Sequence, residues 1–189
     1  EIMFGLNLIV NRGKTIFICD TSVIEYPDAN QLAEMAKSAA RVVRLFGFDP
    51  KVAFLSHSTF GEPATDRTKR LSDAVEILKK EKVDFKFDGE MQPDVALNPI
   101  YQDIYPFSKI VGNANILIMP ALHSAAISTK LMKVFGGGKL IGPLLIGLGS
   151  PIEVAPLRAS TSEILNLASI AAYSSDVIYY SNRSKFTST

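Results

Sequence analysis

Apolar residues along this chain follow two kinds of spacing that alternate from its start to its end. Short apolar runs predict strands at residues 3–10, 15–19, 52–55, 83–87, 115–119 and 140–148. Apolar residues three or four positions apart predict helices that begin near residues 32, 65 and 93, and others that cover residues 122–135 and 163–172. Strands that alternate with helices in this way predict right-handed crossovers and an α/β fold with a mainly parallel sheet.

The first two predicted strands are joined by residues 11–14, a short polar segment that contains Gly13. Such a segment between two apolar runs is typical of a β-hairpin. We expect this hairpin to add an antiparallel edge to the sheet.

Residues 140–165 form the stretch in which a ligand site is expected. Gly142, Pro143 and Gly147 interrupt its apolar run, so the strand should end early and leave room for a close approach. A loop of about a dozen residues, long enough to bind a ligand, then leads to Ser160 and Glu163, which are spaced as a capping box for the next helix. Strand, loop and capped helix together predict a crevice at the edge where open α/β sheets bind ligands.

Composition narrows the class of protein. The 189 residues fit one domain, and 20 basic against 19 acidic residues, without a basic block, argue against a nucleic-acid partner. No apolar run reaches the ~18 residues of a membrane span, and residues 1–10 lack the features of a secretory signal. The single cysteine, Cys19, suits a reducing compartment, and we expect a cytoplasmic protein. The chain begins with Glu1 rather than methionine, as expected for part of a longer protein.

Several polar clusters admit a catalytic or a structural interpretation. Ser56 and His57 are neighbours on a strand end and point to opposite faces, which disfavours a nucleophile and its base and favours an anion-holding loop. Asp88, Glu90 and Asp94 could bind a hard cation, but acids beside a helix start more often interact with its dipole. The three glycines at 136–138 are a helix stop, because no Ser or Thr follows Lys139 as a phosphate loop requires. The residues alone predict an α/β domain with an anion-binding crevice and no catalytic or metal-binding residue.

Four segments, read in order, resemble the successive blocks of the phosphate acetyltransferase family: residues 55–61, 88–97, 113–120 and 142–147. The resemblance runs from about residue 4 to residue 172 and covers the second half of that family's fold. It implies a three-layer α/β/α sandwich over residues 1–173, like the second domain of a phosphate acetyltransferase and of the isocitrate/isopropylmalate-dehydrogenase type. Residues 174–189 are then expected to form a partly frayed C-terminal tail.

His57 stands between two serines, and Phe60 with Gly61 and Glu90 with Met91 and Gln92 follow. In these segments the chain resembles the phosphate-acetyltransferase-like C-terminal domain of bacterial malic enzymes more than the free-standing acetyltransferases. The acetyltransferases carry a Ser-Arg pair in the loop before the last helix and an aspartate on that helix. By position, Pro156 and Leu157 replace the pair, Glu163 replaces the aspartate, and Arg158 lies one residue late. A displaced guanidinium and a lost hydroxyl and amide disfavour phosphoryl recognition.

The resemblance therefore implies a regulatory and oligomerising domain of a NADP-dependent malic enzyme that senses acetyl-CoA or coenzyme A. Malate oxidation, with NADP and a divalent metal, would belong to N-terminal malic enzyme domains outside this chain. The alternatives are a working half of a phosphate acetyltransferase and a purely structural dimerisation module. The expected thioester-binding residues are Ser56, Ser58, Thr59, Gly61, Gly142, Pro143, Gly147, Arg158 and Glu163. The helix at 122–135 is expected either to form a two-fold contact between subunits of a homo-oligomer or simply to pack on the sheet.

Overall fold

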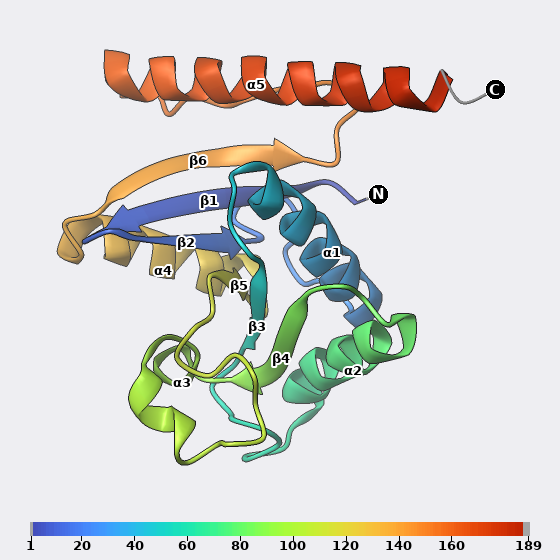
Figure 1. Ribbon diagram of the computed structural model, residues 1–189. Coiled ribbons are helices and arrows are strands. Elements are labelled where there is room, and N and C mark those ends of the chain that lie inside the picture. Colours follow the sequence, from blue (N-terminus) through green and yellow to red (C-terminus); the bar gives the residue numbers. More distant parts are fainter. Residues whose placement is uncertain (1, 187–189) are drawn as a thin grey trace.

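A six-stranded sheet organises the chain (Figure 1). The computed structural model describes the backbone of residues 2–186 and the side chains of residues 2–174. The strand order is β4-β3-β5-β2-β1-β6. The strands are β1 (Phe4–Asn11), β2 (Lys14–Cys19), β3 (Lys51–Leu55), β4 (Lys86–Met91), β5 (Ile116–Ile118) and β6 (Lys139–Ile146).

Parallel pairing joins β4, β3, β5 and β2, and β1 pairs antiparallel with both β2 and β6. The mainly parallel sheet and the hairpin are therefore confirmed. The expectation that the hairpin forms an edge is wrong, because β6 lies along the outer side of β1, with Phe4 opposite Ile146 and Val10 opposite Lys139. The outermost strand on that side is β6.

Helices cover both faces of the sheet and make the three-layer sandwich. On one face, α1 (Ala29–Leu45), α2 (Asp66–Glu81) and α5 (Thr161–Phe186) contribute Leu32, Leu71 and Leu167 to one core. On the other face, α3 (Pro93–Leu97) and α4 (Leu122–Phe135) contribute to a second core, and a short 3-10 helix, η1 (Pro99–Gln102), follows α3. In the part of the chain that the structure describes, no helix combines the length and apolar character needed to cross a membrane.

Local sequence signals place most helix starts. The Thr65 hydroxyl accepts from the Thr68 amide at the start of α2, and Pro93 occupies the first turn of α3. The end of α5 differs from the prediction, because the helix continues to Phe186 instead of ending near residue 172. The Tyr173 hydroxyl donates to the Leu45 carbonyl at 3.3 Å and ties the helix to the end of α1 beyond the predicted stop. Residues 187–189 of the expected tail lie outside the described residues.

Strand β4 lies three residues later than the sequence predicts. It includes Asp88 and Glu90, which lie beyond the strand predicted at residues 83–87, because residues 86–91 pair with β3. Glu90 is 1% exposed, and its carboxylate accepts hydrogen bonds from the Ser58 and Ser72 hydroxyls. These oxygens are therefore already paired and are not open to a cation. No group of three or more acidic, histidine or cysteine residues suited to a metal ion occurs among the described residues.

Candidate functional site

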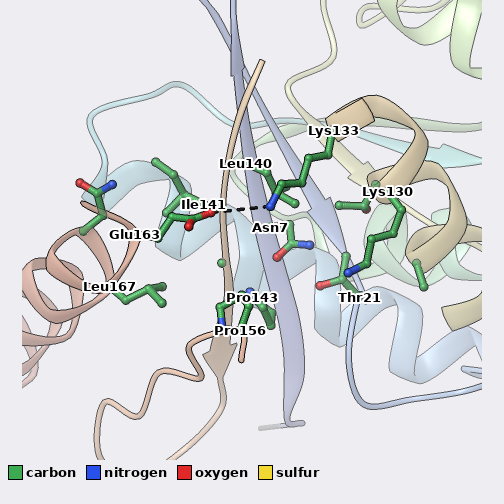
Figure 2. Close-up of a pocket in the computed structure, with 14 residues that line it drawn as sticks. Asn7, Thr21, Lys130, Lys133, Leu140, Ile141, Pro143, Pro156, Glu163 and Leu167 are labelled. Carbon is green, nitrogen blue, oxygen red and sulfur yellow. Dashed lines mark ion pairs between the residues drawn. The ribbon is translucent and has the colours of Figure 1, made fainter. Parts of the chain in front are cut away.

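A cavity of about 240 Å³ lies between β1, β6, α4 and α5 (Figure 2). At Gly142 and Pro143 the pairing of β6 with β1 shifts register, beside Asn7 of β1. A Cβ atom on Gly142 would lie 2.6 Å from Asn7 Oδ1, and the φ of this glycine is +116°, so only glycine fits here. The full lining is Asn7, Thr21, Ala126, Thr129, Lys130, Lys133, Leu140, Ile141, Gly142, Pro143, Pro156, Glu163, Asn166 and Leu167.

Three buried polar atoms in this lining have no hydrogen-bond partner among the described residues. They are Asn7 Oδ1, Thr21 Oγ1 and Asn166 Nδ2. Most buried polar atoms in proteins are paired, and an unpaired one costs about 1–3 kcal/mol. These atoms are an acceptor, a hydroxyl and a donor that line one cavity. A polar ligand bound there would supply their missing hydrogen bonds.

Charged groups from two helices complete the cavity. Lys130 and Lys133 extend from α4, and Glu163 extends from the first turn of α5 (Figure 2). Lys133 Nζ lies 3.6 Å from Glu163 Oε1. The other carboxylate oxygen, Oε2, accepts from the Ser160 amide at 2.8 Å and from the Ser160 hydroxyl at 2.9 Å, which confirms the capping box. These bonds, and secondarily the charge of Lys133, lower the pKa of Glu163, so it stays ionised.

The structure separates residues that the sequence predicted to share one crevice. Gly142, Pro143 and Glu163 line the cavity, whereas Arg158 is exposed and does not line it. Gly147 lines a second cavity, farther along β6. Of the four expected residues between positions 56 and 61, Gly61 lines a third cavity, beside Glu90, and the other three line none of these cavities.

The loop after β3 is held by Glu90 and has few groups left for a ligand. The Ser58 hydroxyl donates to Glu90 Oε1 at 3.0 Å, the Gly61 amide donates to the same oxygen at 2.7 Å, and Ser72 donates to Oε2 at 2.5 Å. Burial opposes ionisation of Glu90, but these hydrogen bonds outweigh it and hold its pKa below the usual value. Thr59 Oγ1 already accepts from the Gln92 amide. The hydroxyls and amides of this loop therefore fix its shape.

Sequence reasoning missed six polar residues of the cavity: Asn7, Thr21, Thr129, Lys130, Lys133 and Asn166. Some signals were present. Asn7 is a polar residue inside an apolar strand, Lys130 and Lys133 are spaced to share one helix face, and Asn166 is one helical turn after Glu163. Thr21 carried no signal, because its position depends on how the loop after β2 folds.

A second cavity, of about 660 Å³, lies between α1, β6 and α5. Glu153 lines it, and its Oε2 atom is buried without a partner among the described residues. Burial raises the pKa of Glu153 to about 7, and a hydrogen bond from the Leu145 backbone offsets only part of this rise.

Glu153 is expected to make stability depend on pH. Its pKa in the folded protein lies above the ordinary value of 4.5, so its contribution is complete below that value and is lost as the pH rises through about 7. The side chain is only partly buried, so we expect a loss of roughly 1–2 kcal/mol. Urea unfolding at about pH 5 and about pH 8 should show this loss, and Glu153→Gln should reduce it. An identical pH dependence in the two proteins would contradict this assignment.

Comparisons with known proteins agree with this fold. The family described as phosphate acetyl/butaryl transferase matches residues 1–172. A NADP-dependent malic enzyme of Rhizobium meliloti is 45% identical over 171 residues, which are 90% of this chain but 22% of that protein. The phosphate acetyltransferase of Bacillus subtilis is 34% identical over 87% of this chain and 51% of its own length.

A solved phosphotransacetylase from Streptococcus pyogenes has the same fold, with a TM-score of 0.88 and 31% identity over 93% of this chain and 54% of that one. The chain thus spans about half of the phosphate acetyltransferases and about a fifth of the malic enzymes that it matches. By sequence and by fold, the chain belongs to the phosphate acetyl/butaryl transferase family.

Proposed function

We propose that this chain is the regulatory and oligomerising domain of a cytoplasmic NADP-dependent malic enzyme and that it senses acetyl-CoA or coenzyme A. The similarity to NADP-dependent malic enzymes of Rhizobium meliloti and Escherichia coli supports malic enzyme activity for the longer protein that would contain this chain. Oxidative decarboxylation of malate, with NADP and a divalent metal, is assigned to malic enzyme domains outside this chain. The single buried cysteine, Cys19, suits the cytoplasm.

One observation carries the proposal. The cavity has unpaired polar atoms and two lysines that suit a ligand, but the loop beside it lacks the groups that acetyl transfer needs. Pro156 lines the cavity and has no amide donor, Leu157 is fully exposed, and Arg158 lies outside. A site that keeps the groups needed to bind a ligand but lacks those needed to transfer its acetyl group fits a domain that senses the ligand.

Thermal unfolding with and without ligand tests the proposal. A ligand that binds only the folded chain stabilises it, by about 2.7 kcal/mol at a concentration 100 times its dissociation constant. Acetyl-CoA or coenzyme A at millimolar concentration should raise the unfolding temperature, and malate with NADP should not. No shift with either acetyl-CoA or coenzyme A would contradict the proposal.

A working half of a phosphate acetyltransferase is the second candidate. Glu163 favours it, because this carboxylate occupies the position of the family's aspartate and lines the cavity beside Lys133. Formation of acetyl phosphate distinguishes the two functions.

The proposed oligomer is an isologous dimer through α4. One face of α4 carries four exposed apolar side chains at helical spacing, namely Ile127 (60% exposed), Leu131 (51%), Val134 (74%) and Phe135 (84%). The small residue Ala125 is buried against the sheet, so the apolar stripe and not the small-residue face is free for a partner. Contiguous exposed apolar surface of this kind is typical of subunit contacts.

Sedimentation velocity at micromolar concentration should therefore show a dimer. Leu131→Glu with Val134→Glu should shift it to monomer, because two charges would be buried at the contact. Ile104→Glu is the matched control, since Ile104 is also exposed, at 62%, but lies on another surface. A monomeric unsubstituted chain, or a double variant that still dimerises, would refute this contact.

A further inference from the structure

The positive charge at the cavity comes from α4 and not from the loop that carries Arg158. We propose that Lys133 recognises a phosphate group of the ligand and that Glu163 occupies this lysine until the ligand binds. This inference rests on the proposed function and adds to it the residue that selects the ligand's charge.

The geometry of the pair supports an exchangeable contact. Lys133 Nζ and Glu163 Oε1 are 3.6 Å apart, and the two side chains are 49% and 30% exposed. Figure 2 shows the two side chains directed toward each other beside β6. An ion pair this long and this exposed is weak, so an incoming anion can displace it.

Glu163 cannot move closer to Lys133, because hydrogen bonds hold its other carboxylate oxygen in place. Oε2 accepts two hydrogen bonds from Ser160 that cap α5. A phosphate group is free to approach Lys133 more closely and offers several oxygens for charge-assisted hydrogen bonds. We therefore expect phosphate to make the better partner for this lysine.

The surroundings of Lys133 favour a phosphate joined to a polar group. Lys130, one turn earlier on α4, extends toward Thr21 in Figure 2 and has no ion pair within the described part of the chain. The two positive charges of these lysines exceed the single negative charge of Glu163, so the cavity has a net positive charge. The unpaired atoms of Asn7, Thr21 and Asn166 are then available to the uncharged part of the same ligand.

Four substitutions separate this assignment from the alternatives. Lys133→Gln removes the proposed charge, and Arg158→Gln removes the arginine that the sequence pointed to. Glu163→Gln removes the competing charge but keeps the cap, since glutamine also completes a capping box. Lys80→Gln, at an exposed position on α2, controls for the loss of one positive charge.

Binding of inorganic phosphate and of coenzyme A to the whole chain is followed by ³¹P NMR titration. Lys133→Gln should weaken coenzyme A binding about ten-fold or more, the range of a lost charge-assisted hydrogen bond. Glu163→Gln should strengthen it roughly two- to five-fold, and the other two variants should bind as the unsubstituted chain does. If Lys133→Gln also binds inorganic phosphate more weakly, Lys133 recognises any phosphate group. If only coenzyme A binding is weakened, Lys133 recognises the phosphates of the nucleotide.

Two results have different meanings. If the unsubstituted chain binds coenzyme A and Lys133→Gln binds it equally well, or if Glu163→Gln weakens binding, this inference is wrong and the proposed function stands. If the unsubstituted chain binds neither probe, the proposed function fails and this inference fails with it.

Discussion

Replacing Asp20 with alanine is expected to destabilise the fold by about 3–5 kcal/mol, a large share of the 5–15 kcal/mol typical of a domain. Asp20 is 2% exposed at the end of β2. Its carboxylate accepts from the backbone amides of Gly5 at 2.7 Å, Ser22 at 2.8 Å, Val23 at 3.2 Å and Ile24 at 2.5 Å. Alanine would leave these amides without their acceptor and would release the loop that carries Thr21 into the cavity.

Urea unfolding followed by circular dichroism measures this loss. Asp73→Ala is the matched control, because Asp73 makes an exposed ion pair with Lys69 on α2 and should change stability by less than about 1 kcal/mol. A change below about 1 kcal/mol for Asp20→Ala would show that the loop does not depend on this carboxylate.

Acetyl transfer to phosphate is expected to be at least about 10,000-fold slower than the ordinary turnover of ~10 per second. A single lost donor in such a site costs about 100- to 1000-fold, and this loop has lost a serine hydroxyl with its amide and an arginine in register. The losses need not multiply, since groups that act together are not independent. The structure adds a reason, because Arg158 is exposed outside the cavity that Pro156 and Glu163 line.

Formation of acetyl phosphate from acetyl-CoA and phosphate measures this rate. The same low rate is expected of a longer protein that contains this chain. Pro156→Ser with Leu157→Arg restores both missing groups and should raise the rate. Turnover of roughly 10 per second by the unsubstituted protein would contradict the proposed function and establish the second candidate.

The sequence predicted the elements of the fold better than their arrangement. Apolar spacing and helix caps placed α4 at Leu122–Phe135 and the start of α2 after Thr65, because these signals are local. Pairing between distant strands decided the rest. Lys51–Leu55 determines which residues extend as β4, and β6 covers the hairpin that local signals would leave at an edge.

The site shows the same limit. Gly142, Pro143 and Glu163 were predictable, because strand-interrupting residues and a capping box mark the ends of elements. The role of Glu90 was not, since the carboxylate is one strand away from the Ser58 loop that it holds. Lys133 reaches the cavity only because α4 and α5 meet across β6, which no local pattern encodes.

The central claim is that acetyl-CoA binds in the cavity between β1, β6, α4 and α5. Titration of the ¹⁵N-labelled chain with acetyl-CoA, followed by two-dimensional NMR, tests it most directly, because the measurement detects weak binding and locates it. The account predicts that the signals of Thr21, Lys133, Gly142 and Asn166 shift together and saturate, while those of α2 stay in place. An absence of shifts at millimolar acetyl-CoA, or shifts confined to residues outside this cavity, would contradict it.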